Sequence, residues 1–194
     1  MSSTPKSSNP QEASGPLFHP FDPIIDSHSK ILILGTFPSI KSFENAFYYG
    51  HPQNQFWKIL ASIFGEVVPR TIDEKIAFLR RHRIALWDMV ASCERKDSLD
   101  TSLKKITPND IAALLERYPD IEAVFCTGKK SFELFERHFA GLRPAFYLPS
   151  PSPAHRTLSL ERKVEIWREL LGDFLEIPEG KKEGDGEQGR KDHP

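Results

Sequence analysis

The sequence predicts an α/β fold, a three-layer αβα sandwich with a central, mainly parallel four-stranded sheet. Short apolar runs alternate with helical patterns along the chain, which is typical of parallel strands joined by crossover helices. The periodic apolar residues are confined to 17–177, a length that suits one domain with a substantial core. Hydrophobic residues make up 39% and charged residues 27% of the chain, ordinary values for a globular protein. No apolar stretch reaches the roughly 18 residues that a membrane helix needs.

Four short apolar runs are expected to form the strands of the sheet. Each is rich in aliphatic or aromatic residues, and turn-forming residues follow it. The runs are 30–37, 84–90, 122–128 and 145–149. In open α/β sheets, ligands bind where the carboxyl ends of the strands meet. We therefore expect the functional residues in the loops that follow these four runs.

Five segments carry apolar residues at helical spacing. Asn54 is a favourable N-cap for the first, and Thr71 and Glu74 have the spacing of a capping box. Thr107, followed by Pro108 and then by Asp110 at the third position, indicates another helix start. The expected helices are 54–65, 71–81, 107–117, 129–139 and 159–175.

The two ends of the chain differ from the rest. Residues 1–16 are polar and 178–194 are Gly-rich and charged, so we expect both to be disordered tails. The first has no apolar core, so we do not expect it to be a secretory signal. The two cysteines, Cys93 and Cys126, are too few for a disulfide scaffold and lack nearby zinc ligands. We expect an intracellular monomer in the cytoplasm or nucleoid, or in a eukaryotic nucleus, without metal or cofactor.

The first long loop follows the strand over 30–37. Gly35 allows a sharp turn and Pro38 stiffens the exit. The loop carries five aromatic residues and then His51 and the amides of Gln53 and Asn54. Aromatic residues and amides suit a planar heteroaromatic ligand. Its ring stacks on the aromatic faces, and the amides form hydrogen bonds with its edge. The alternative is a structural loop that leads into a capped helix.

The second informative loop covers 148–156 and follows the last strand. Three prolines with intervening serines make it stiff and non-helical. Serine hydroxyls, backbone N–H groups and the charge of Arg156 suit contacts with phosphate. The alternative is a rigid structural turn. The net charge of −1 gives no global signal for nucleic acid, so any basic patch must be local.

Together the two loops resemble the uracil-DNA glycosylase superfamily over residues 17–176. That superfamily has a glycine, two variable residues, a proline and a small residue after the first strand, a Pro-x-Asn-x-Phe-Trp element in one branch, and a Pro-Ser-Pro motif after the last strand. The order and strand context of the three motifs agree here. They are Gly35-Thr36-Phe37-Pro38-Ser39, Pro52-Gln53-Asn54-Gln55-Phe56-Trp57 and Pro149-Ser150-Pro151.

Departures from that pattern indicate the branch. Phe37 stands where many relatives have the Asn or Asp that positions water, and Leu148 stands where uracil enzymes have a histidine. The third strand ends in Cys126-Thr127-Gly128 in place of an asparagine that reads uracil. The hypoxanthine-DNA glycosylase family shares these features, and the resemblance includes Trp87-Asp88 and Ser98-Leu99-Asp100.

The resemblance implies an enzyme that extrudes deoxyinosine from double- or single-stranded DNA and hydrolyses its N-glycosidic bond, leaving an abasic site. Asn54 is the implied key asparagine, which orients water or donates to a purine nitrogen, and Asp88 is expected to orient water or to order the first loop. The expected base-binding pocket comprises Gly35, Thr36, Phe37, Pro38, Ser39, Tyr49 and Thr127. The expected DNA contacts are Ser150, Ser152, Pro153, His155, Arg156 and Lys129.

Three other functions fit the same residues. A uracil-DNA glycosylase with an atypical pocket is the nearest. A catalytically inert DNA-binding module on the same fold is the second, because the first motif contains neither a carboxylate nor an amide. The third is an enzyme that acts on free nucleosides, which the near-neutral net charge allows.

Overall fold

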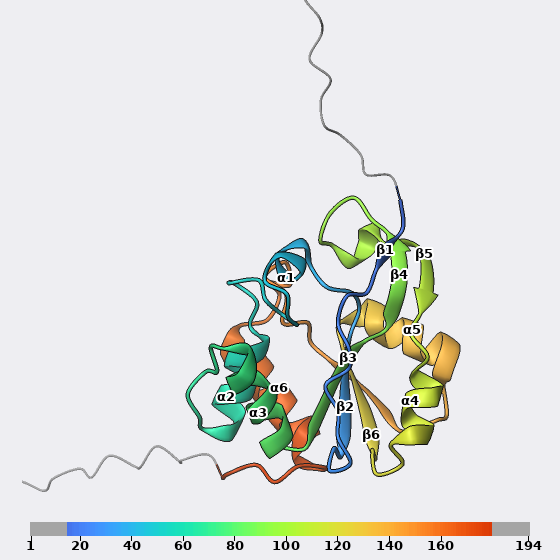
Figure 1. Ribbon diagram of the computed structural model, residues 1–194. Coiled ribbons are helices and arrows are strands. Elements are labelled where there is room, and N and C mark those ends of the chain that lie inside the picture. Colours follow the sequence, from blue (N-terminus) through green and yellow to red (C-terminus); the bar gives the residue numbers. More distant parts are fainter. Residues whose placement is uncertain (1–14, 180–194) are drawn as a thin grey trace, which may run out of the picture.

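A computed structural model describes residues 15–179 of the protein, so most of both expected tails lies outside the described residues (Figure 1). Its centre is a four-stranded sheet in the order β3-β2-β6-β7, and all three strand pairs are parallel. The strands are β2 (Ile31–Gly35), β3 (Ile84–Asp88), β6 (Ala123–Thr127) and β7 (Ala145–Leu148). The predicted parallel sheet is confirmed.

Helices cover both faces of this sheet and complete the three layers (Figure 1). Alternate residues of a strand point to opposite faces. Ile31 and Ile33 accordingly pack against one group of helices, and Leu32 and Leu34 pack against the other. The first group is α2 (Phe56–Phe64), α3 (Ile72–Arg81) and α6 (Leu160–Gly172), and the second is α4 (Ile111–Arg117) and α5 (Lys129–Phe139).

A second, three-stranded antiparallel sheet was not predicted. It has the order β1-β4-β5 and consists of β1 (Leu17–Phe18), β4 (Val90–Glu94) and β5 (Lys104–Pro108). A short 3₁₀ helix, η1 (Asp100–Ser102), lies in the connection from β4 to β5. The strand predicted over 84–90 therefore divides at Met89: its first part belongs to the parallel sheet and Val90 begins β4.

The helix start predicted at Thr107 is wrong. Thr107 pairs with Ser92 and Pro108 with Val90 in β5, so tertiary strand pairing overrides the local helix signal. The helix starts later, where the Asp110 carboxylate accepts the backbone N–H of Ala113 at 3.0 Å. The capping box of Thr71 and Glu74 is confirmed. No helix among residues 15–179 is long and apolar enough to cross a membrane.

The first long loop contains a helical turn that the sequence did not predict, α1 (Ile40–Glu44). The hydroxyl of Ser39 caps it by accepting the N–H of Ser42. At the far end of the loop, α2 begins at Phe56 with Gln55 at the N-cap position, two residues later than expected. Asn54 still serves this helix end, because its Oδ1 accepts the N–H of Phe56 at 2.9 Å.

Candidate active site

A cavity lies where the four parallel strands end, as the fold class leads one to expect. Its walls come from the loops after β2, β3, β6 and β7, and from the connection between β4 and β5. Eleven residues expected from the sequence line it: Gly35, Thr36, Phe37, Pro38, Ser39, Tyr49, Asn54, Asp88, Thr127, Ser150 and Ser152. Its lining also includes Ser42, Tyr48, Ser98, Asp100 and Pro151.

Gly35 allows two polar side chains to meet in this cavity. It is the last residue of β2 and is in register with Asp88, the last residue of β3. A Cβ at position 35 would collide with Oδ1 of Asp88 and would lie 2.8 Å from the hydroxyl of Tyr49. Glycine is therefore required for the Asp88 carboxylate and the Tyr49 hydroxyl to lie against the backbone here.

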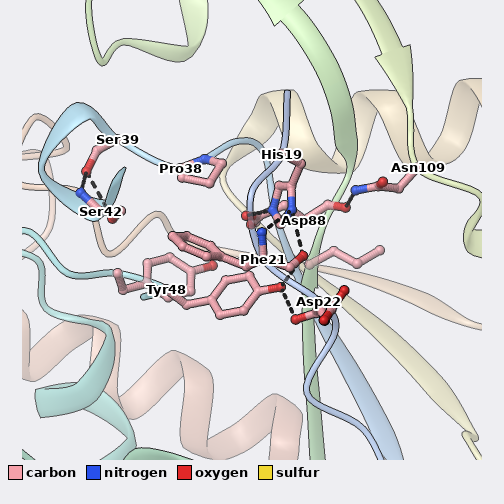
Figure 2. A network of polar contacts seen from close by, with 12 residues as sticks. His19, Phe21, Asp22, Pro38, Ser39, Ser42, Tyr48, Asp88 and Asn109 are labelled. Carbon is pink, nitrogen blue, oxygen red and sulfur yellow. Dashed lines mark hydrogen bonds and ion pairs between the residues drawn. The ribbon is translucent and has the colours of Figure 1, made fainter. Parts of the chain in front are cut away.

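Asp88 is buried and is held by a histidine that the sequence did not single out. Nε2 of His19 lies 2.7 Å from Oδ2 of Asp88, and both side chains are almost fully enclosed. An ionised carboxylate only accepts hydrogen bonds, so Nε2 carries a proton that it donates. Nδ1 lies 2.9 Å from the carbonyl oxygen and 3.3 Å from the backbone nitrogen of Phe21, so both ring nitrogens of His19 have polar neighbours (Figure 2).

The segment from Leu17 to Ile25, which we call the N-terminal strap, brings His19 into this position. The backbone N–H of His19 donates to Ala91 O, and Ile24 forms an antiparallel bridge with Leu86. The hydroxyl of Tyr48 donates to the carbonyl of Asp22 at 2.8 Å, which joins the strap to the first loop (Figure 2). A lone histidine before the first predicted strand gave no signal of this role.

Tyr49 forms a rigid wall of the cavity. Its backbone is left-handed, with φ 52°, and its ring stacks on Phe56 with centroids 4.0 Å apart and planes at 6°. Its hydroxyl donates to Oγ1 of Thr127 at 2.9 Å, because the Thr127 hydroxyl itself donates to Leu34 O. Burial, with the nearby charge of Asp88, raises the pKa of Tyr49 well above its ordinary value. The side chain is therefore a neutral donor, and Phe56 covers one face of its ring.

Phe37 lines the cavity but is largely enclosed, with 8% of its surface exposed. The guanidinium of Arg95 lies 5.1 Å from the centre of its ring and 5.5 Å from that of Phe43. Arg95 also donates to the carbonyl of Pro38. The first motif is thus held from outside by a cation–π contact and a hydrogen bond, so its backbone is rigid around the cavity.

Asp100 is the second carboxylate of the cavity, and the sequence assigned it no role. Oδ2 of Asp100 accepts the hydroxyl of Thr36 at 2.9 Å. Burial raises the pKa of this carboxyl and the charge of Asp88 raises it further, against lowering by the Thr36 hydrogen bond, Arg95 and Lys130. The segment Ser98-Leu99-Asp100, already part of the family resemblance, was the available signal.

The predicted DNA contacts fall into three groups. Ser150 and Ser152 line the cavity and also an adjoining surface groove. Lys129 and His155 line that groove but not the cavity. Pro153 and Arg156 line neither, and Nε of Arg156 donates to the carbonyl of Pro153 at 3.3 Å.

Helix α6 holds the loop after β7 in place. The buried Lys163 donates from Nζ to His155 O and to Oε1 of Gln55, each at 2.9 Å. Nε1 of Trp167 donates to Pro149 O at 3.1 Å. The loop is therefore tied both to α6 and to the start of α2. The amphipathic pattern of the last helix gave no indication of these polar contacts.

Residues 15–179 contain no group of three or more His, Cys, Asp or Glu side chains placed to hold a metal ion. The polar side chains of the cavity include two carboxylates, the Asn54 amide and several hydroxyls, with the enclosed histidine next to Asp88. Such groups bind a polar planar molecule, hold a water molecule and move protons.

Comparisons with known proteins show the family to which the chain belongs. Residues 23–171 match the family model described as the uracil DNA glycosylase superfamily. A hypoxanthine DNA glycosylase from Methanosarcina barkeri (strain Fusaro / DSM 804) is 38% identical over 114 residues, which cover 58% of this chain and 72% of the relative. A protein of the same name from Methanosarcina acetivorans is 33% identical over 147 residues, which cover 75% of this chain and 92% of the relative.

A solved structure shows the same fold. It is a solution NMR structure from Methanosarcina acetivorans, described as a candidate uracil DNA glycosylase, with 30% sequence identity and a TM-score of 0.67. The superposition covers 78% of this chain and 97% of that structure.

Proposed function

This chain belongs to the uracil-DNA glycosylase superfamily, and we propose that it is a DNA glycosylase that removes hypoxanthine from deoxyinosine in DNA and leaves an abasic site. The observation that carries the proposal is that Asn54 and Asp88, from separate segments of the chain, line one cavity with the first motif. The names of the two Methanosarcina relatives support hypoxanthine as the base.

The substrate nucleotide has to leave the duplex before it can enter this cavity. A glycosylase extrudes its target base, and a weakly paired base such as hypoxanthine costs less to extrude. Ser150 and Ser152 lie both in the cavity and in the adjoining groove, where Lys129 and His155 also lie. We propose that this groove receives the DNA backbone, with Arg156 as an outer phosphate contact and Pro153 as the wedge that fills the vacated place.

The proposed base slot lies between Tyr49 and the first motif. Phe56 occupies one face of the Tyr49 ring, which leaves the other for the base. Phe37 contributes at most a ring edge, because most of its surface is covered. The hydroxyl of Thr127 and the backbone around Pro38 and Ser39 supply polar groups in the cavity that can read the base edge.

We propose that Asp88 and Asn54 act on water. Breaking the C1′–N9 bond gives the sugar oxocarbenium character, which a nearby carboxylate stabilises. Oδ2 of Asp88 is bound to His19, and Oδ1 accepts a proton from the attacking water. Since Oδ1 of Asn54 accepts the N–H of Phe56, its Nδ2 is the atom that donates to the water oxygen.

A base-release panel tests this proposal. Matched duplexes that carry inosine, uracil, xanthosine or mismatched thymine are incubated with the wild type and with Asn54→Ala, and the released bases are measured. We expect hypoxanthine to be released fastest by the wild type and about 10²-fold or more slowly by the variant.

The same panel separates the other functions. Much faster release of uracil would overturn the substrate assignment, and binding of inosine duplexes without release of a base would indicate an inert binding module. Hydrolysis of free inosine, but not of inosine within DNA, would indicate a nucleoside enzyme. Undiminished activity in Asn54→Ala would refute the role of that residue.

A further inference from the structure

The two carboxylates of the cavity have different surroundings. Asp88 has the enclosed imidazole of His19 at 2.7 Å as a hydrogen-bond partner. Asp100 has no such partner: among residues 15–179, its side chain receives one hydrogen bond, from the neutral hydroxyl of Thr36. Where two nearby carboxyl groups have such different surroundings, one can take the role of base and the other that of acid.

We propose that Asp100 is the general acid of this site and gives its proton to a ring nitrogen of the leaving base. This inference rests on the proposed excision of a purine and adds a residue that was not assigned from the sequence. Asp100 lines both the cavity and the groove beside it, so this residue lies where the cavity meets the groove that we propose for DNA. Thr36 holds Oδ2, which leaves Oδ1 to carry the proton.

The charges that face Asp100 favour its protonated form. Burial is the largest influence on its pKa and raises it, and the negative charge of Asp88 on β3 raises it as well. Thr36, Arg95 after β4 and Lys130 on α5 lower the pKa by a smaller amount, and the net direction is upward. Tyr49, which also faces this carboxyl, is neutral.

The chemistry of a purine leaving group calls for such an acid. As the C1′–N9 bond breaks, its electron pair passes to the base, and a proton from Asp100 to a ring nitrogen lets the base leave uncharged. A lone pair of the water oxygen forms the new bond to C1′, and the proton of that water passes to Asp88. Transfer of this proton back to Asp100 through solvent restores both groups, so one water is consumed per base released.

The test is the pH dependence of single-turnover excision on an inosine duplex, measured from about pH 5 to about pH 9. The proteins are the wild type, Asp100→Asn, Asp100→Glu and Asp97→Asn. Asp97→Asn is a matched control, because Asp97 lies on the same connection, is exposed and makes the same change of charge. Binding to a duplex with 2′-fluoro-2′-deoxyinosine, which resists hydrolysis, is measured in parallel.

We expect the wild-type rate to fall at high pH as the acid ionises. Excision by Asp100→Asn should be about 10²- to 10⁴-fold slower and should not decrease further at high pH. The variant should bind the resistant duplex with an affinity within about threefold of the wild type. Asp100→Glu should recover part of the rate, and Asp97→Asn should match the wild type.

Three results would overturn the acid role and leave the proposed function intact: excision by Asp100→Asn within about threefold of the wild type, an unchanged pH profile in a slow variant, or a loss explained by weaker binding. If Asp100→Asn fails to fold, the wild-type protein alone still tests the acid role. An excision rate that does not fall at high pH overturns that role. Absence of hypoxanthine release by the wild type would instead refute the proposed function and this inference with it.

Discussion

Nε2 of His19 lies 2.7 Å from Oδ2 of Asp88, although 69 positions separate the two residues. This contact joins the N-terminal strap to the end of β3, where Asp88 lines the cavity. The backbone carbonyl of Asp88 is held as well, by Nδ2 of Asn109 at 2.8 Å (Figure 2). Asp88 is thus fixed from two elements that are not part of the parallel sheet.

Replacing His19 by alanine should leave a buried carboxylate without its partner. We expect a loss of about 3–5 kcal/mol in the free energy of unfolding and a large loss of excision, measured by denaturant titration and base release. The exposed His28→Ala is the control. In a double-mutant cycle with Asp88→Ala, the double variant should lose less free energy of unfolding than the two single variants lose together. Additive losses would contradict the pairing of the two side chains.

Replacing Gly35 by alanine should displace the groups that meet there. The added methyl collides with Asp88 Oδ1 and crowds the hydroxyl of Tyr49. We therefore expect the free energy of unfolding to fall by about 1–3 kcal/mol and the base to be released much more slowly. Gly172→Ala, where the nearest atom is an Ile177 side-chain carbon at 4.0 Å, should leave activity unchanged. Equal activity in the two variants would contradict the close approach at Gly35.

Two substitutions of Asn54 should separate its structural and catalytic roles. Asn54→Asp keeps an oxygen for the N–H of Phe56 but loses the donor Nδ2, so stability should be kept and excision lost. Asn54→Ala should lose both, with a stability cost of about 1 kcal/mol. Thermal unfolding and single-turnover excision are the two measurements. Near wild-type excision in Asn54→Asp would show that Nδ2 has no part in the reaction.

Asp100→Asn should raise the stability of the protein near neutral pH while it slows catalysis. The folded-state pKa of Asp100 is raised, so the native state resists losing a proton that the unfolded chain gives up more readily. The wild type therefore loses stability as pH rises from the ordinary pKa of Asp through the raised one, and the asparagine variant does not. Denaturant titrations should show that the free energy of unfolding of Asp100→Asn exceeds that of the wild type by an amount that grows with pH across this range. Below this range the two proteins should be equally stable. A gain independent of pH would contradict the raised pKa.

The parallel sheet and the loops at its carboxyl edge could be predicted because they rest on local patterns. The apolar runs that became β2 and β6 are buried along their whole length, and Gly35 and Asn54 stand in spaced motifs. These patterns lie in short stretches of the sequence and do not depend on which distant residues come into contact.

The second sheet and the histidine behind Asp88 could not be predicted, because both depend on long-range pairing. β1 is two residues long, which is too short to show the alternation of apolar and polar residues that marks a strand. Thr107 and Pro108 carry a helix signal that pairing with β4 overrides. The roles of Lys163 and Asp100 likewise arise only where separate segments pack together.

The N-terminal strap also affects the order in which the site can be made. It is among the first described segments to leave the ribosome, and its partners are made later: Asp88 follows 69 positions behind His19, and β4 comes after Asp88. At roughly 5–20 residues per second, the strap waits roughly 3–14 s for them. The loop after β7 also waits, roughly 1–4 s, for Trp167, which follows Pro149 by 18 positions. The loop that contributes Ser150 and Ser152 to the cavity is therefore held by Lys163 and Trp167 only after α6 has been translated, so we expect the site to be completed late in synthesis.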